Sequence, residues 1–96
     1  IVILDNNFLG MVRQWQQLFF DRRYSSVALQ NPDFVTIAKG FGMPGQTVDK
    51  AEDLDAAITT MLAHDGPYLL HVKVEQEENV FPMVPSGAAV DEIRLE

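Results

Sequence analysis

The chain has 96 residues, and seven basic against fourteen acidic residues give it a net charge of −7. That balance leaves no basic stripe to bind phosphates, so we expect no nucleic acid partner. The absence of cysteine excludes disulfides and thiolate metal sites. No apolar run reaches the roughly 20 residues that span a bilayer, so we expect no membrane partner. The length suits one small domain that buries only a modest part of its surface.

The first residues are predicted to form a strand that ends in a polar turn. Ile1–Leu4 is a run of apolar residues, which indicates a strand covered on both faces in a parallel sheet. Asp5, Asn6 and Asn7 end this strand, because Asx side chains bond to nearby backbone and tolerate tight turns. Ligands of open α/β sheets bind beyond the carboxyl ends of strands, so this oxygen-rich turn is predicted to face the ligand crevice.

The first helix is predicted over Phe8 to about Asp21. Its apolar residues recur at three- and four-residue spacings on more than one face: Leu9, Met11, Val12, Trp15, Leu18 and Phe19. A helix this apolar must be covered on more than one side. The remaining chain is short, so we expect a partner domain, subunit or ligand to cover it. Residues 24–30 are predicted to form a loop.

The second helix has a clear predicted start. Asn31 is a good N-cap, and Pro32 suits the first helical position. Apolar residues follow at helical spacing over Phe34–Phe41. Gly40 and Gly42 are predicted to end this helix.

The remaining elements alternate between strand and helix. A short strand is predicted over Gln46–Val48, and a helix over Leu54–Leu62, with Asp49 and Glu52 as its capping-box pair. Tyr68–Val74 is predicted to be the second long strand. Its alternation points Leu70 and Val72 one way and His71 the other.

This order of elements predicts an α/β fold with right-handed crossovers. The expected architecture is a three-layer, partial parallel sheet flanked by helices. Residues 1–74 would form the α/β core, and residues 75–96 an irregular tail that covers a neighbouring surface or is mobile. Because the chain lacks an initiator Met and opens within a strand, we expect a piece of a larger protein.

Several blocks of the sequence carry a family resemblance. They are Asp-Asn-Asn-x-Leu-Gly-Met-Val-Arg-Gln-Trp-Gln-x-Leu-Phe, the following Arg-Arg-Tyr-Ser, and the segments 31–34, 65–67 and 78–89. Together they resemble the cofactor domain of acetolactate synthase (acetohydroxyacid synthase) catalytic subunits, which are thiamine-diphosphate-dependent enzymes. The resemblance covers almost the whole chain. It implies that residues 1–96 are the C-terminal part of a thiamine-diphosphate-binding fold.

The polar turn has two interpretations, a simple helix cap or a Mg²⁺ site. Mg²⁺ prefers hard oxygen ligands and is commonly held by a few protein oxygens plus phosphates. The resemblance implies that the Asn6 side chain and the Phe8 main-chain carbonyl are metal ligands. The alternative register uses the Asn7 side chain and the Leu9 carbonyl, and it would need a one-residue deletion. Asp5 departs from the Asn that is usual at its position in the family.

The start of the first helix suits a diphosphate, because its free N–H groups and positive dipole end attract anions. Gly10 also lets backbone approach a ligand closely. Cofactor contacts are therefore expected from Leu9, Gly10 and Met11, besides Asn6 and Phe8. The resemblance further implies that Met11 lies beside the reactive part of the cofactor, and that Met11 and Trp15 line the substrate channel. Ordinary core packing is the alternative for Met11, Gly10 and Trp15.

The implied reaction is the condensation of two 2-keto acids with loss of CO₂, such as pyruvate to acetolactate in branched-chain amino acid biosynthesis. No catalytic residue is expected within these 96 residues, since His64 and His71 lack partners at catalytic spacing and His71 is predicted to be structural. The activating Glu and an FAD site are expected elsewhere in the parent protein, so the isolated chain should be inactive. Expected partners are 2-keto acids, the rest of the catalytic subunit, further copies in a homodimer or higher oligomer, and a regulatory subunit. The expected location is cytoplasmic.

Two alternatives to this function remain. One is another thiamine-diphosphate-dependent enzyme, such as a glyoxylate carboligase, a pyruvate oxidase or a decarboxylase. The other is a non-catalytic interaction module whose apolar first helix docks on a partner.

Overall fold

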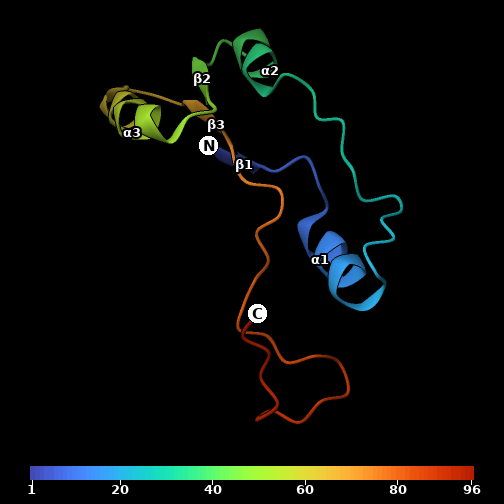
Figure 1. Ribbon diagram of the computed structural model, residues 1–96. Helices are drawn as coiled ribbons and strands as arrows, with labels where there is room; N and C mark the ends of the chain where they lie inside the picture. Colours follow the sequence, from blue (N-terminus) through green and yellow to red (C-terminus); the bar gives the residue numbers. More distant parts are fainter.

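The computed structural model describes all 96 residues and is an α/β fold with one parallel sheet (Figure 1). The elements in chain order are β1 (Val2–Asp5), α1 (Gly10–Phe19), α2 (Phe34–Gly40), β2 (Gly45–Val48), a 3₁₀ turn (Ala51–Asp53), α3 (Leu54–Ala63) and β3 (Leu69–Lys73). The sheet order is β1-β3-β2, and β3 pairs in parallel with both neighbours. The predicted fold class is confirmed.

The central strand β3 carries the core on both of its faces. Leu70 and Val72 pack with Val48 of β2 and Ala57 of α3, and all four are buried. His71 points to the opposite face, where its ring lies edge-on to that of Phe34 from α2. The predicted alternation in this strand therefore holds, and α2 and α3 cover opposite faces of the sheet.

The edge strand β1 differs from its prediction. Val2 and Leu4 are 53% and 70% exposed, so the expected cover on both faces is wrong for the contacts within this chain. The reason is that α1 does not fold back over β1. It lies well apart from the sheet, beyond a turn (Figure 1). β1 therefore leaves an unpaired strand edge and an apolar face exposed within this chain.

The second helix begins later than predicted, and its cap is a different residue. Asp33 is the N-cap, and its carboxylate accepts hydrogen bonds from the backbone N–H and the hydroxyl of Thr36. Asn31 and Pro32 precede the helix and lie outside it. The Asn31 side chain instead donates from Nδ2 to Asp5 on β1.

The third helix also starts differently. The predicted capping box is absent, since neither Asp49 nor Glu52 makes a capping bond and no side chain caps α3. The turn Ala51–Asp53 leads into the helix instead. This turn satisfies part of the first-turn backbone with 3₁₀-type hydrogen bonds.

The chain is extended for its size. Its radius of gyration is 17.3 Å, whereas a compact domain of this length has about 13 Å. α1 and the tail, residues 75–96, form an arm that leaves the sheet in the same direction (Figure 1). The tail has no helix or strand, and it is held together locally by a bridge between Met83 and Arg94. No helix in the structure has both the length and the hydropathy needed to cross a bilayer.

Candidate functional site

The turn that follows β1 is built from two nested side-chain turns. The Asn7 N–H donates to Asp5 Oδ1 at 2.8 Å, and the Phe8 N–H donates to Asn6 Oδ1 at 3.0 Å. Asn7 has a φ of +58°, in the left-handed region that Asn tolerates better than most residues. The run of three Asx residues therefore forms the turn that the sequence predicts.

A segment that the sequence reads only as a loop holds this turn in place. The Leu9 N–H donates to the Val27 carbonyl, and the Leu29 N–H donates to the Asn7 carbonyl, both at 2.8 Å. Val27 is 2% exposed, so this contact is anchored in a packed position. Residues 27–31 thus run antiparallel to the turn and fix it from outside.

The Asp5 carboxylate is the centre of a buried hydrogen-bond network. Its Oδ1 accepts from the Asn7 N–H and from Asn31 Nδ2 at 2.7 Å, and its Oδ2 lies 2.8 Å from His71 Nε2. Burial raises the pKa of this carboxyl, but the donors on Asn7, His71 and Asn31 outweigh burial and hold the pKa below its usual 3.8. Asp5 is therefore a stable buried anion.

His71 is satisfied on both ring nitrogens. Nε2 meets Asp5, and Nδ1 lies 3.3 Å from the hydroxyl oxygen of Thr47 on β2. The parallel register of the sheet, which sets Thr47 beside His71, accounts for this placement. The prediction that His71 is a structural histidine is consistent with these contacts, and its partners link β1, β3 and β2.

The backbone at the start of α1 keeps several polar groups free. The Phe8 carbonyl accepts no hydrogen bond, whereas the Leu9 carbonyl accepts from the Arg13 N–H. The N–H groups of Gly10, Met11 and Val12 donate to no protein acceptor, and α1 has no side-chain cap. An oxygen acceptor and three amide donors are thus available within one turn of chain.

Gly10 lies against the turn. A Cβ built on it would stand 3.3 Å from Nδ2 of Asn6, which is tighter than ordinary packing. Gly10 therefore allows the Asn6 carboxamide to lie beside the first turn of the helix. Of the predicted site residues, Asn6, Phe8, Leu9 and Gly10 come together here, although the Leu9 N–H is already taken by Val27.

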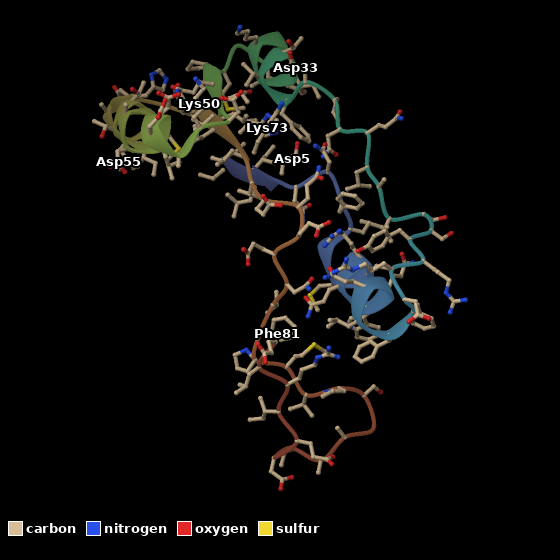
Figure 2. All side chains as sticks on the ribbon, viewed as in Figure 1. Asp5, Asp33, Lys50, Asp55, Lys73 and Phe81 are labelled. Atoms are coloured by element: carbon tan, nitrogen blue, oxygen red, sulfur yellow. The ribbon has the colours of Figure 1, made fainter.

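A polar hollow of about 380 Å³ opens beside the ends of the strands. Asp5, Asn7, His71 and Lys73 are among the residues that line it. Asp5 and Lys73 sit opposite each other in the sheet register and appear near one another in Figure 2. No cluster of three His, Cys, Asp or Glu side chains able to hold a metal is found. A metal at the turn would therefore rely on amide and main-chain oxygens, which are hard ligands that suit Mg²⁺.

The helix α1 buries polar side chains and exposes apolar ones. Arg13 is 2% exposed and lies over the rings of Phe8 and Tyr24, with its guanidinium 3.0 Å from the Glu77 carboxylate. Gln14 is equally buried and clamps the tail, since it both donates to and accepts from the backbone of Val80. These contacts attach the tail to α1.

The opposite side of α1 carries the predicted channel residues. Met11 and Trp15 are 57% and 51% exposed, one helical turn apart. Trp15, Phe19, Met83 and Val84 are among the residues that line an apolar groove of about 230 Å³ between α1 and the tail. The structure therefore places Met11 and Trp15 near the turn but outside its hydrogen-bond network.

Sequence reasoning missed three features of this site. The bonds of Asn31 and His71 to Asp5 join residues 26 and 66 positions apart, which no local pattern signals. The docking of residues 27–31 on the turn was likewise invisible in a stretch without periodicity. The only signal in the sequence is a weak one: an acidic residue at the end of one predicted strand and a histidine within another.

The chain matches a known protein family and several named relatives. Residues 1–72 match the family described as thiamine pyrophosphate enzyme, C-terminal TPP binding domain. The chain is 55% identical over 94 residues to the acetolactate synthase isozyme 2 large subunit of Escherichia coli, a match that covers 97% of this chain and 17% of that protein.

Relatives in other organisms have related names. The chain is 45% identical over 92 residues to the mitochondrial acetolactate synthase catalytic subunit of Saccharomyces cerevisiae, covering 96% of this chain and 13% of that protein. It is 42% identical over 104 residues to the chloroplastic acetolactate synthase 1 of Oryza sativa, covering 100% of this chain and 16% of that protein. The chain thus spans 13–17% of the length of these relatives.

Proposed function

We propose, from the premise that this chain belongs to the C-terminal TPP-binding domain family of thiamine pyrophosphate enzymes, that it is part of an acetolactate synthase catalytic subunit. The parent enzyme would condense two 2-keto acids with loss of CO₂, as the names of its relatives suggest. The observation that carries the proposal is the polar turn after β1, where a free carbonyl oxygen and free amides stand beside Asx oxygens.

The proposed metal ligands are the side-chain oxygen of Asn6 and the carbonyl oxygen of Phe8. The Phe8 carbonyl is unpaired, whereas the Leu9 carbonyl required by the alternative register is engaged by the Arg13 N–H. Asn6 Oδ1 accepts one hydrogen bond and retains a second lone pair. The free Phe8 carbonyl supports Asn6 and Phe8 as the proposed Mg²⁺ ligands.

The proposed diphosphate contacts come from the first turn of α1. The N–H groups of Gly10 and Met11 are free and lie at the positive end of the helix dipole, where they suit a phosphate anion. Leu9 would contribute its exposed side chain, because both of its backbone polar groups are already bonded. Close packing of Gly10 on Asn6 keeps the metal ligand and the phosphate donors together.

Thiamine diphosphate, when bound, would supply the electron sink for the loss of CO₂. The contribution of this chain is to orient the cofactor through the turn and to shape the approach of the second 2-keto acid. Met11 and Trp15 fit that second task because they are exposed on one face of α1 just beyond the turn. The apolar groove beside Trp15 would select acceptors by the length of their alkyl group.

The remaining expectations concern the parent protein. We propose a cytoplasmic homodimer or higher oligomer with a regulatory subunit, and with FAD bound outside these residues. The apolar surface left open on β1 and α1 supports cover by the rest of the catalytic subunit or by another copy. The isolated 96-residue chain should produce no acetolactate from pyruvate with Mg²⁺ and thiamine diphosphate.

The test compares two neighbouring substitutions in the intact parent protein. Asn6→Ala should weaken Mg²⁺-dependent binding of thiamine diphosphate, measured by calorimetry, and reduce acetolactate formation. Asn7→Ala is the matched control and should bind the cofactor nearly as the parent does. The opposite ranking would assign the metal to Asn7. Retention of full affinity by both variants would refute the proposed site.

Product analysis separates the rival functions. An acetolactate synthase should form acetolactate or acetohydroxybutyrate from 2-keto acids, whereas another carboligase, decarboxylase or oxidase of the family would give a different product. An intact protein that neither retains thiamine diphosphate nor responds to Mg²⁺ would instead support a non-catalytic interaction module.

A further inference from the structure

We infer that His71 and Asn31 are positioning residues, which hold the turn Asn6–Phe8 in its ligand-presenting shape by fixing the Asp5 carboxylate. This inference rests on the proposed function, since it assigns a role toward the Mg²⁺ and diphosphate site. Neither residue touches the proposed ligands. Both act through Asp5, which bonds directly to the backbone of the turn.

The first step is that Asp5 sets the conformation of the turn. Its Oδ1 accepts the Asn7 N–H, and this bond closes the Asx turn in which Asn7 takes a positive φ of 58°. Asn7 lies directly between the two proposed ligands. A rotation of the Asp5 carboxylate would break its hydrogen bond with the Asn7 N–H. The backbone of the turn could then relax toward commoner conformations.

The second step is that the Asp5 carboxylate cannot rotate in the folded chain. Its side chain is 4% exposed, and the three donors that hold it come from three different parts of the chain. Asn7 belongs to the turn itself, Asn31 to the segment before α2, and His71 to the centre of the sheet. Donors on both oxygens fix the plane of the carboxylate, as a single donor could not.

The third step is that His71 is itself immobilised. Phe34 packs edge-on against its ring at a centroid distance of 5.2 Å, and Thr47 meets its far nitrogen. Because Asp5 is an anion that accepts from Nε2, that nitrogen carries a proton. The central strand of the sheet therefore determines, through His71 and Asp5, where the turn places its oxygens.

The geometry allows a matched pair of substitutions at one position. In His71→Gln the amide nitrogen lies the same number of bonds from Cα as Nε2, so a donor to Asp5 is retained. In His71→Asn the amide nitrogen corresponds to Nδ1, so it faces Thr47 and cannot reach Asp5. Both replacements are polar and smaller than His, and they differ chiefly in that donor.

The experiment measures Mg²⁺ affinity by calorimetry on the intact parent protein in the presence of thiamine diphosphate. His71→Asn and Asn31→Ala should each weaken Mg²⁺ binding about tenfold or more, the usual effect of losing a group that orients a metal ligand. His71→Gln should restore most of that affinity. Thr47→Val removes the bond to Nδ1 but keeps the donor to Asp5, so it should weaken Mg²⁺ binding less than His71→Asn does.

Three results would overturn the inference. They are unchanged Mg²⁺ affinity in both His71→Asn and Asn31→Ala, equal losses in His71→Gln and His71→Asn, and a Thr47→Val loss as large as that of His71→Asn. If His71→Asn does not fold, Asn31→Ala decides, because Asn31 lies outside the sheet and is only partly buried. Absence of Mg²⁺ and cofactor binding in the unsubstituted protein would instead refute the proposed function.

Discussion

The two ten-residue helices of this chain bury opposite kinds of side chain. α3 turns its apolar face to the sheet, where Ala57 joins the core and Ile58 and Met61 pack against it. α1 buries Arg13 and Gln14 and leaves Met11, Val12, Trp15 and Phe19 about half exposed. Both sequences have apolar residues at helical spacing, yet only α3 uses them for its own fold.

This difference indicates that α3 stabilises the fold of this chain, whereas α1 presents its apolar face to contacts outside the chain. α3 is stabilised by apolar burial against β2 and β3, the usual source of helix stability in proteins. α1 is held by polar contacts to the tail and by backbone bonds of the turn. Its free apolar face is consistent with contacts to a cofactor, a substrate and the rest of the protein.

The largest expected effect comes from breaking the contact between α3 and the sheet. Leu70→Ala removes a side chain that is 1% exposed and should lower the local stability of the sheet by about 2–5 kcal/mol. Leu62→Ala, at an exposed position of α3, should change this stability by less than about 0.5 kcal/mol. Hydrogen exchange of the β3 amides in the intact protein measures both values.

The second effect concerns the polar attachment of α1. Gln14→Leu leaves the Val80 N–H and carbonyl without partners, and should weaken docking of the tail by about 1–3 kcal/mol. The expected readout is faster hydrogen exchange at the Val80 amide, with unchanged exchange in β3. Equal protection of Val80 in the variant and the parent would show that the clamp does not hold the tail.

Acid should weaken the N-cap of α2, and α1 has no equivalent cap. The Thr36 N–H and hydroxyl bonds hold the pKa of Asp33 below its usual 3.8. Because this pKa is lower in the folded state than in the unfolded state, the cap stabilises α2 fully above about pH 4 and is lost as the pH falls through the lowered value. α1 has no carboxylate cap, so a step from the loss of a helix cap is expected in α2 only.

Exchange of the Thr36 amide as a function of pH checks this expectation. Asp33→Asn is the control, since Asn also caps helices but does not titrate, so the acid-dependent step at Thr36 should disappear. Persistence of the same step in Asp33→Asn would assign it to another group.

The smallest effect on stability is expected on the free face of α1. Trp15→Ala should change stability by less than about 0.5 kcal/mol, because Trp15 is 51% exposed. In the intact parent protein, the proposed role of Trp15 in the substrate channel predicts that the same substitution changes the ratio of acetohydroxybutyrate to acetolactate. A large loss of stability without a change of product ratio would mean that Trp15 is a packing residue.

The ends of the elements show how far local patterns reach. Asn31-Pro32 is as good a helix start as the sequence contains, yet Asp33 is the cap, and the Asn31 side chain donates to Asp5, 26 positions away. The prediction that β1 is covered on both faces also failed. An apolar strand pattern indicates that both faces need cover, but it does not show whether this chain provides that cover. The alternation in β3 succeeded because both of its faces are covered from within the chain.

By itself the sequence determined the α/β order, the polar turn after the first strand and the residues that the turn offers, because propensity and apolar period act over neighbouring positions. Only the tertiary structure decided that Asp5 is an anchor held by His71 and Asn31, and that α1 faces outward. Parallel strand pairing brings residues 66 positions apart into contact, and no pattern among neighbouring residues of the sequence indicates such a contact.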